Sequence, residues 1–200
     1  MIVIIDYNIG NVGSIKNMIT KLGFECKISK HKKEIENATK LILSGVGSFD
    51  NGIANLKKLN LYNLINKKVT VDKIPILGIC LGMQLMAEES QEGKEKGFGW
   101  IKSRVLKIND EDCKETTIPI LGWNYIKTTI KNPLINEDRQ RFYFVHSFYF
   151  PNDTTNSIAL ANVGFDYCVA IQKDNIFGVQ FHPEKSHNYG KKVLQKFCEF

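Results

Sequence analysis

The feature that most constrains the fold is an apolar run that ends at a single cysteine between two glycines. Residues 74–79 predict a buried strand, Gly78 and Gly82 flank Cys80, and a helical pattern follows from Met83 to Ala87. A strand, a sharp turn and a helix in this order have the form of a nucleophile elbow, with sulfur in place of the serine oxygen. The alternative is a buried structural cysteine beside two turn glycines. A base near Cys80 would decide between them.

The residues around Cys80 suit such a turn. The nucleophile of an elbow has a strained backbone and the chain packs closely on both sides, so its neighbours must be small. The helix that follows would direct its N-terminal amides at the sulfur, which favours the thiolate and offers a donor to an oxyanion.

The chain has four histidines that could supply the base. His31 lies in a lysine-rich stretch and His187 in a polar loop, so both are expected at the surface. His146 lies inside the β-prone stretch 142–148, where a core histidine with satisfied hydrogen bonds is an alternative to a functional one. His182 is the strongest candidate, because it ends an apolar strand and is followed by a carboxylate.

Pro183 and Glu184 complete a His-Pro-Glu run at the end of that strand, residues 176–181. The imidazole and the carboxylate are two residues apart and project from the same sheet edge, where the turn fixed by proline can bring them together. A strand-end histidine with a chance acidic neighbour is the alternative. Cys80, His182 and Glu184 together predict a thiolate nucleophile, a general base and acid, and a carboxylate that fixes the imidazole tautomer.

The order of these three residues resembles class I glutamine amidotransferases. The resemblance runs nearly end to end and rests on six stretches in family order: Ile5-Asp-Tyr7 with Gly10-Asn11, Gly45-Val-Gly47, Gly78-Ile-Cys-Leu-Gly-Met-Gln84, Gly122-Trp-Asn124, Phe142-Tyr-Phe-Val-His-Ser147 and Gly178-Val-Gln-Phe-His-Pro-Glu184. The stretches at 122–124 and 142–147 resemble in particular the glutaminase subunits of imidazole glycerol phosphate synthase, an enzyme of the histidine pathway.

The resemblance implies a reaction and a role for each site residue. Cys80 would attack the side-chain amide of L-glutamine to form an acyl thioester, His182 would protonate the leaving ammonia, and Glu184 would hold the imidazolium. The implied oxyanion donors are the amide of Leu81 and one amide of the loop Gly45, Val46 and Gly47, and the implied substrate-binding residues are Gln84, His146 and Ser147. On spacing alone, an exposed helix residue explains Gln84 equally well.

The resemblance also implies a partner. The ammonia would pass to a synthase subunit of (β/α)-barrel type in a heterodimer, with Trp123 and Asn124 at the interface; a core tryptophan is the alternative for Trp123. The family usually has proline at Ser44 and a His-Met pair at Ile120 and Leu121. These departures keep open a paralogous glutaminase that serves a sugar-amidating synthase for surface polysaccharide. A non-catalytic scaffold is a third possibility, which the complete triad argues against.

Composition predicts one ordinary domain, residues 1–200, with a substantial core. Hydrophobic residues make up 43% of the chain and charged residues 24%, as in globular proteins. The five cysteines are scattered without metal spacing, so we expect a reducing, cytoplasmic compartment, no metal and no cofactor. The first residues lack the features of a signal peptide, and no apolar run reaches the ~20 residues of a membrane span.

The net charge of +6 comes mainly from scattered lysines. These lysines are not interleaved with aromatic residues on one element, so we do not expect nucleic acid as a partner.

The hydrophobic pattern predicts an α/β fold. Strands at 2–6, 24–28, 40–44 and the elbow alternate with helices at 14–22, about 33–37 and about 52–66, the first with Ser14 as N-cap and Gly23 after its end. This order predicts a doubly wound parallel sheet with its site at the carboxyl ends of the strands. From Gly97 on, strands expected at 98–108, 117–128, 142–150, 157–163, 167–173 and 176–181 predict an antiparallel C-terminal extension. A last helix is expected at about 188–198.

Overall fold

The computed structural model describes residues 1–109, 111, 117–135, 137 and 139–200, so that Cys113 lies outside the described residues. The strands are β1 (Ile2–Ile5), β2 (Cys26–Ser29), β3 (Lys40–Gly45), β4 (Ile76–Cys80), β5 (Ala87–Ser90), β6 (Ile101–Lys107), β7 (Ile120–Thr128), β8 (Arg141–His146), β9 (Phe148–Pro151), β10 (Ser157–Asn162), β11 (Asp166–Lys173) and β12 (Ile176–Val179). The helices are α1 (Val12–Lys21), α2 (Lys32–Glu36), α3 (Phe49–Lys58), α4 (Tyr62–Thr70), α5 (Leu81–Gln84), the 3-10 turn η1 (Pro183–Lys185) and α6 (His187–Glu199).

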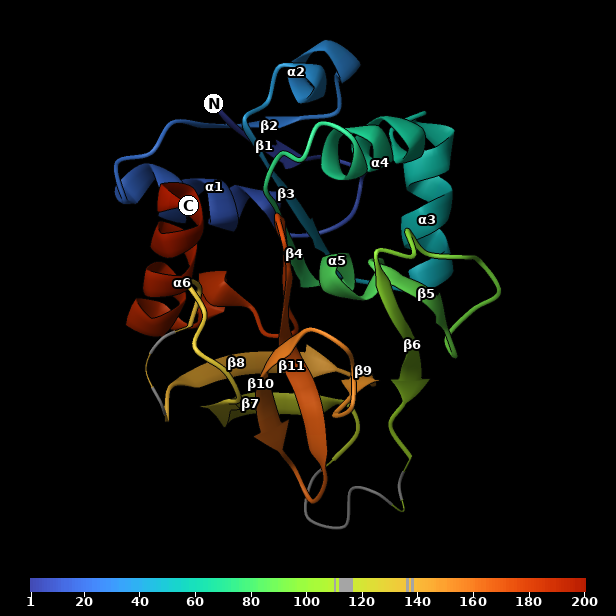
Figure 1. The fold of residues 1–200 in the computed structure, drawn as a ribbon, viewed down its shortest axis with the longest axis vertical. Helices are drawn as coiled ribbons and strands as arrows, with labels where there is room; N and C mark the ends of the chain where they lie inside the picture. Colours follow the sequence, from blue (N-terminus) through green and yellow to red (C-terminus); the bar gives the residue numbers. More distant parts are fainter. Residues whose placement is uncertain (110, 112–116, 136, 138) are drawn as a thin grey trace.

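These strands form one sheet in the order β2-β1-β3-β4-β12-β11-β10-β7-β8, with β5, β6 and β9 attached beside it. The first five strands in this order are parallel, and the strands from β11 to β8 are antiparallel. The predicted α/β fold with a parallel sheet and an antiparallel extension is confirmed. Figure 1 shows the antiparallel strands at the lower end, below the parallel strands and their helices.

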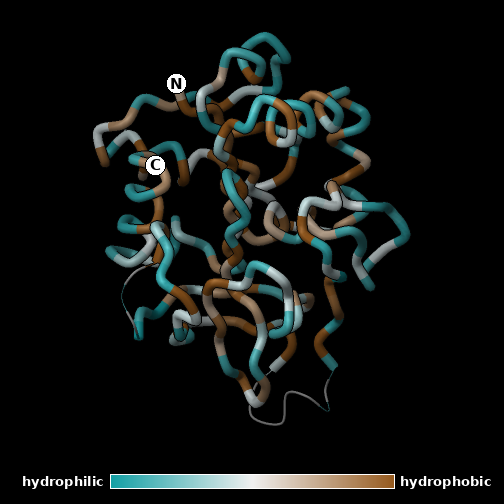
Figure 2. The backbone as a smooth tube through the Cα atoms, in the orientation of Figure 1, coloured by the Kyte–Doolittle hydropathy of each residue, from teal (hydrophilic) through white to brown (hydrophobic). Residues whose placement is uncertain are grey.

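The parallel strands are apolar on both faces because helices cover both. In β1, Ile2 and Ile4 pack into the cluster that contains α1 and α6, whereas Val3 and Ile5 pack into the cluster that contains α3 and α4. Alternation along a strand sends successive side chains to opposite faces, so a strand covered on both sides is apolar throughout. In Figure 2 the hydrophobic segments follow these central strands, and the hydrophilic ones gather on the outer helices and loops.

The helix expected at 52–66 is two helices, α3 and α4, and the prediction of one continuous helix is wrong. The chain turns at Asn60, which has a φ of +54°. Leu56 and Ile65 are both buried, yet nine residues at about 100° each would place them on opposite sides of one helix. Breaking the helix between them lets both side chains face the sheet.

Three smaller predictions also need correction. The first helix begins at Val12 and not at Ser14, so Asn11 occupies the N-cap position, although Gly23 does follow the helix end with a φ of +87°. The helical pattern expected to reach Ala87 ends at Gln84, and β5 follows. The single strand expected at 142–150 is divided at Ser147 into β8 and β9.

The strand expected at 176–181 does not belong to the antiparallel extension. It is β12, which pairs in parallel with β4 inside the central sheet. The turn between β11 and β12 reverses the chain at Asp174, whose φ is +51°. As a result β12 lies beside β4, the strand that ends at Cys80.

No helix among the described residues has both the length and the apolar character that crossing a membrane requires.

Candidate active site

Cys80 lies at a strained turn between β4 and α5. Its backbone has φ +53° and ψ −112°, a region that L-residues rarely occupy and that costs about 1–3 kcal/mol. The predicted elbow is therefore present. Strain of this kind persists only where the surrounding packing fixes the chain, and here glycines allow that packing.

Three glycines let α5 lie directly on the sheet. A Cβ on Gly82 would be 1.7 Å from the carbonyl oxygen of Leu43, and one on Gly78 would be 2.6 Å from the carbonyl oxygen of Gly82. A Cβ on Gly178 of β12 would be 2.7 Å from Cγ of Met83. Any larger residue would lift the turn that carries Cys80 away from β3, β4 and β12.

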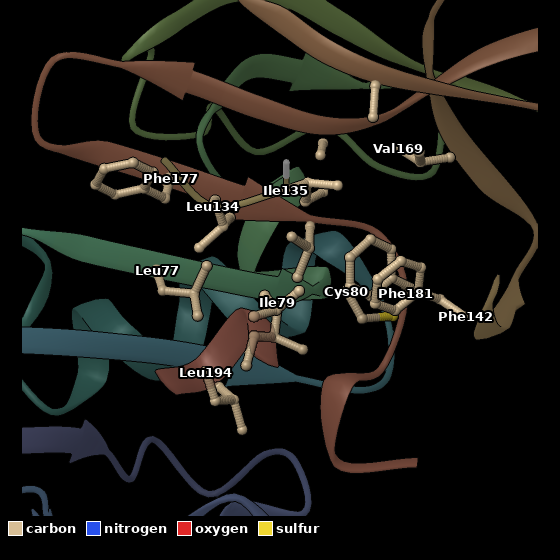
Figure 3. Packing of buried hydrophobic residues seen from close by; sticks show 14 of the residues in the cluster. Leu77, Ile79, Cys80, Leu134, Ile135, Phe142, Val169, Phe177, Phe181 and Leu194 are labelled. Atoms are coloured by element: carbon tan, nitrogen blue, oxygen red, sulfur yellow. The ribbon is translucent and has the colours of Figure 1, made fainter. Parts of the chain in front are cut away.

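The pairing of β4 with β12 brings the histidine to the cysteine. Ile79 is level with Val179 in this parallel pair, so the next residues, Cys80 and Gln180, leave the sheet side by side. The side-chain amide of Gln180 donates to the Cys80 sulfur at 3.7 Å. Figure 3 shows Cys80 at the end of its strand with Phe181 beside it. His182 follows one residue later, at the same edge of the sheet.

His182 and Glu184 form a buried pair. Nδ1 of His182 lies 2.8 Å from Oε1 of Glu184, and the two side chains are 1% and 2% exposed. Burial by itself lowers the pKa of His182, but interaction with the Cys80 sulfur and the hydrogen bond to Glu184 outweigh it and raise the pKa to about 9. At neutral pH the imidazole is therefore protonated, with its Nδ1 proton held by the carboxylate.

A serine that the sequence analysis did not single out fixes the backbone of His182. Ser186 is fully buried, and its hydroxyl accepts a hydrogen bond from the Tyr143 amide at 2.9 Å and donates to the His182 carbonyl at 2.7 Å. The His182 amide in turn donates to the Tyr143 carbonyl at 2.9 Å. The segment that follows β12 is thereby attached to β8.

The predicted oxyanion donors lie close to Cys80, from β3 and from the start of α5. Gly45 is level with Cys80 in the pair of β3 and β4, and Gly47 has a φ of +118°, which favours glycine. Leu81 follows Cys80 and begins α5. The helix α5 spans only four residues. We therefore attribute the stabilisation of a thiolate or an oxyanion at Cys80 to individual backbone amides, first of all that of Leu81, and not to a helix dipole.

A cavity of about 510 Å³ opens beside Cys80. Its size is ordinary for a small-molecule site. All three predicted substrate residues, Gln84, His146 and Ser147, line it. The complete lining is Val46, Gly47, Ser48, Cys80, Leu81, Gln84, Glu92, Pro119, Val145, His146, Ser147 and Phe148.

Gln84 and His146 are ordered by the same carbonyl. The amide of Gln84 donates to the Phe148 carbonyl at 3.0 Å and to Oε1 of Gln180 at 3.0 Å, so Gln84 is not the exposed helix residue that spacing alone allowed. Nδ1 of His146 lies 2.9 Å from the Phe148 carbonyl, which can only accept, so this nitrogen carries a proton. Burial lowers the pKa of His146 to about 4 against the opposing effect of that bond. His146 is therefore neutral, and its Nε2 is an acceptor without a partner among the described residues.

Glu92 adds a carboxylate to the cavity that the sequence analysis missed. It accepts a hydrogen bond from the amide of Phe49 at 2.8 Å. Burial is the main cause that raises the pKa of Glu92, with Asp50 adding to it and the Phe49 amide opposing it. Glu92 lies in a polar stretch with no distinctive spacing, so nothing in the sequence pointed to it. Among the described residues, no cluster of three or more His, Cys, Asp or Glu side chains could hold a metal ion.

Trp123 lies on the outer face of β7, and the alternative of a core tryptophan is wrong. Its side chain is 38% exposed, with Leu121 at 61% and Tyr125 at 65% on the same face. The ring stacks on His187 at 5.4 Å, and the guanidinium of Arg141 lies 5.3 Å from its centre. His187 and His31 are exposed, as predicted. We call Leu121, Trp123 and Tyr125 the outer face of β7.

The two departures from the family pattern occupy different surroundings. Ser44 is buried in β3, level with Ile79 of β4, immediately before the oxyanion loop. Ile120 is buried and paired with His146, whereas Leu121 is exposed on the outer face of β7. Asn124, the other predicted interface residue, is half-buried between Trp123 and Tyr125.

The fold and the elbow define a class of protein, and comparison with known proteins agrees. The family model described as glutamine amidotransferase class-I matches residues 3–199. A solved structure described as a glutamine amidotransferase has a TM-score of 0.76 at 17% identity, covering 99% of both chains, which establishes likeness of fold. The chain belongs to the class I glutamine amidotransferase family.

Within this family the chain is similar to proteins named imidazole glycerol phosphate synthase subunit HisH 2. The one from Methanococcus maripaludis is 50% identical over 202 residues, which cover 100% of this chain and 99% of the relative. The one from Pseudomonas aeruginosa is 39% identical, with the same coverage. The chain is a member of the HisH group of glutamine amidotransferases, and the predicted resemblance is confirmed.

Proposed function

We propose that this chain is the glutaminase subunit of an imidazole glycerol phosphate synthase. It hydrolyses L-glutamine to glutamate and ammonia, and the ammonia passes to a (β/α)-barrel synthase subunit that makes imidazole glycerol phosphate and aminoimidazole carboxamide ribotide in histidine biosynthesis. The observation that carries the proposal is Cys80 at a strained elbow, with the buried His182–Glu184 pair at the end of the adjacent parallel strand.

The first half of the reaction forms a thioester. The Cys80 sulfur attacks the side-chain carbonyl carbon of glutamine, and the oxygen becomes an oxyanion that accepts hydrogen bonds from the Leu81 amide and an amide of Gly45–Gly47. The His182 imidazolium then gives its Nε2 proton to the departing nitrogen. The C–N bond breaks and ammonia leaves, with the new C–S bond in place.

The second half consumes water. Neutral His182 takes a proton from a water molecule as its oxygen attacks the thioester carbon, and the C–S bond then breaks to release glutamate. Glu184 keeps Nδ1 protonated throughout, so Nε2 is always the nitrogen that faces the reaction.

The cavity offers separate groups for the two ends of glutamine. We assign the amino-acid end to Gln84, His146 and Ser147, since all three line the cavity beside Cys80. The bare Nε2 acceptor of His146 and the carboxylate of Glu92 both suit an ammonium group. The α-carboxylate would take backbone donors near Ser147.

The proposed contact for the synthase subunit is β7, where Trp123 lies on the outer face and Asn124 follows it in the strand. A tryptophan that buries a large apolar area and keeps one N–H donor is a frequent anchor at protein interfaces. The proposal treats residues 1–200 as one amidotransferase domain in a heterodimer. We also propose a cytoplasmic location, since a reducing compartment keeps thiols reduced and Cys26, Cys80, Cys168 and Cys198 are free thiols.

A second candidate keeps the same chemistry and changes the acceptor. The exposed Leu121 and the buried Ile120 lie where the family usually has a His-Met pair, next to the proposed interface. This departure favours a partner with a different surface, such as a sugar-amidating synthase. Supplying the purified chain with glutamine and either synthase, and measuring which product incorporates the amide nitrogen, separates the two.

The nucleophile provides the test of the proposal. In the complex with its synthase, Cys80→Ala is expected to abolish synthesis from glutamine and to leave synthesis from added ammonium intact. Cys26→Ala is the matched control, because Cys26 is a free thiol on β2, outside the cavity lining, and should leave both rates unchanged. Normal glutamine turnover by Cys80→Ala would show that Cys80 is not the nucleophile.

A further inference from the structure

A buried phenol lies beneath the oxyanion loop without a hydrogen-bond partner. Tyr7 follows β1 and has no exposed surface. Its hydroxyl makes no hydrogen bond with any described residue. Buried tyrosine hydroxyls are usually paired, so an unpaired one near a site calls for a physical reason. Tyr7 belongs to the stretch Ile5-Asp-Tyr7 that resembles the family.

The hydroxyl lies against the first residue of the loop. A Cβ on Gly45 would be 2.1 Å from the Tyr7 oxygen, so only glycine fits there. Gly10 packs beside it in the same way, since its Cβ would be 2.9 Å from the Ser44 carbonyl oxygen. The segment that follows β1 thus packs against the start of the loop, and neither Tyr7 nor Gly10 is among the residues that line the cavity.

The geometry of a peptide group connects this hydroxyl to the oxyanion. The N–H and the C=O of one peptide point in opposite directions. If the Gly45–Val46 peptide presents its N–H to the cavity, its carbonyl oxygen points away from the cavity, where the Tyr7 hydroxyl beside Gly45 can reach it. A buried carbonyl needs a donor. The hydroxyl can be that donor, because burial and the nearby Cys80 sulfur raise the pKa of Tyr7 and keep it protonated.

We infer that Tyr7 is a positioning residue whose hydroxyl donates to the Gly45 carbonyl when the Val46 amide faces the oxyanion. Tyr7 then has its partner only in the active arrangement of the loop. This inference deepens the proposed function and rests on it. The alternative for the hydroxyl is a hydrogen bond to the Cys80 sulfur.

The test is Tyr7→Phe, measured as glutamine hydrolysis in the complex with the synthase subunit. Losing the donor leaves the inward carbonyl unpaired, so kcat is expected to fall about 10- to 100-fold. The KM for glutamine should stay the same, because the oxyanion exists only in the transition state. The melting temperature of the variant should equal or exceed that of the unaltered chain, since the removed hydroxyl had no partner.

The matched control is Tyr62→Phe. The Tyr62 hydroxyl donates to the Gly97 carbonyl at 2.7 Å and lies outside the cavity lining, so this variant should melt lower and keep its kcat. An unchanged kcat in Tyr7→Phe, or a sharp drop in its melting temperature, would overturn the inference. A changed rate of Cys80 alkylation by iodoacetamide would overturn it too, by assigning the hydroxyl to the sulfur. A complex of the unaltered chain that does not hydrolyse glutamine would instead contradict the proposed function.

Discussion

The two halves of the sheet bury their strands differently. In the parallel half, all five residues of β4 are buried, whereas in the antiparallel half β7 alternates and exposes Leu121, Trp123 and Tyr125. Parallel strands need crossover helices, which cover both faces, and antiparallel strands are joined by short turns that can leave one face open. The covered half can hold a strained nucleophile at its strand ends. The open half can offer a face to another protein.

This comparison predicts that chemistry and partner binding respond to different substitutions. Variants at the carboxyl edge of β3, β4 and β12 should change glutamine turnover and leave the affinity for the synthase unchanged. Variants on the outer face of β7 should do the reverse. We propose that the loop Gly45–Gly47 couples the two halves, since its amides are the proposed oxyanion donors.

The largest effect is expected for Glu184→Gln. Loss of the carboxylate that orients a catalytic histidine lowers kcat by about 10⁴ in comparable triads, a milder loss than removal of the nucleophile. The imidazolium of His182 is present below its pKa of about 9 and is lost above it, so activity should fall on the alkaline side. Without the carboxylate the pKa of His182 drops, and this alkaline limb should move to lower pH.

The measurement for Glu184→Gln is kcat/KM against pH, together with synthase affinity by titration calorimetry. If the alkaline limb of the pH profile does not shift in Glu184→Gln, the titration of His182 is not the cause of that limb. A weakened complex would contradict the assignment of chemistry to the parallel half.

The second effect concerns the coupling of the halves. We predict that in the isolated chain one oxyanion donor of Gly45–Gly47 is turned away from the cavity, and that partner and acceptor binding turn it in. One missing donor accounts for about 10²–10³ in rate. Steady-state glutaminase rates with and without the synthase and its acceptor measure this ratio, and equal rates would rule out gating.

A third and smaller effect is expected for Trp123→Ala. Loss of an aromatic anchor should weaken synthase binding by about 2 kcal/mol, roughly 30-fold in Kd. The isolated chain should keep its melting temperature and its basal glutaminase rate. Val71→Ala is the control, because Val71 is an exposed apolar residue just after α4 in the parallel half. A sharply lower melting temperature with unchanged affinity would move the interface elsewhere.

The smallest effect is expected for Ser186→Ala. Its hydroxyl joins β8 to the segment that follows β12, and removing it takes one hydrogen bond from the Tyr143 amide and one from the His182 carbonyl. We expect about a 10-fold lower kcat from a less well placed imidazole, with KM unchanged. Ser186→Thr keeps the hydroxyl and should restore part of the rate, whereas a change confined to the melting temperature would make Ser186 purely structural.

Local patterns predicted the parallel half well. Glycines beside Cys80 indicated the elbow, and the alternation of apolar strands with helices indicated a doubly wound parallel sheet. The break at Asn60 was missed, although Leu56 and Ile65 could not have shared one face of a single helix. Such a break follows from packing against the sheet, which overrides local helix propensity.

The rest of the site depends on contacts between residues far apart in the sequence. Gln180 bonds to Cys80 only because β12 pairs in parallel with β4, and the sequence assigned that strand to the antiparallel extension. Ser186, which follows η1, bonds to the Tyr143 amide on β8, 43 residues earlier in the chain. A local hydrophobic pattern does not tell which strands pair or in which register. The triad was therefore predictable from the order of the motifs, but the residues that position the triad were not.

The most direct test of the central claim is to trap the covalent intermediate. The complex is quenched with acid during steady-state hydrolysis of glutamine, digested, and analysed by mass spectrometry. The account predicts one glutamyl group on the peptide that contains Cys80, absent from Cys80→Ala and from samples without glutamine. Undiminished glutamine turnover with no label on Cys80, or with the label on another residue, would contradict it.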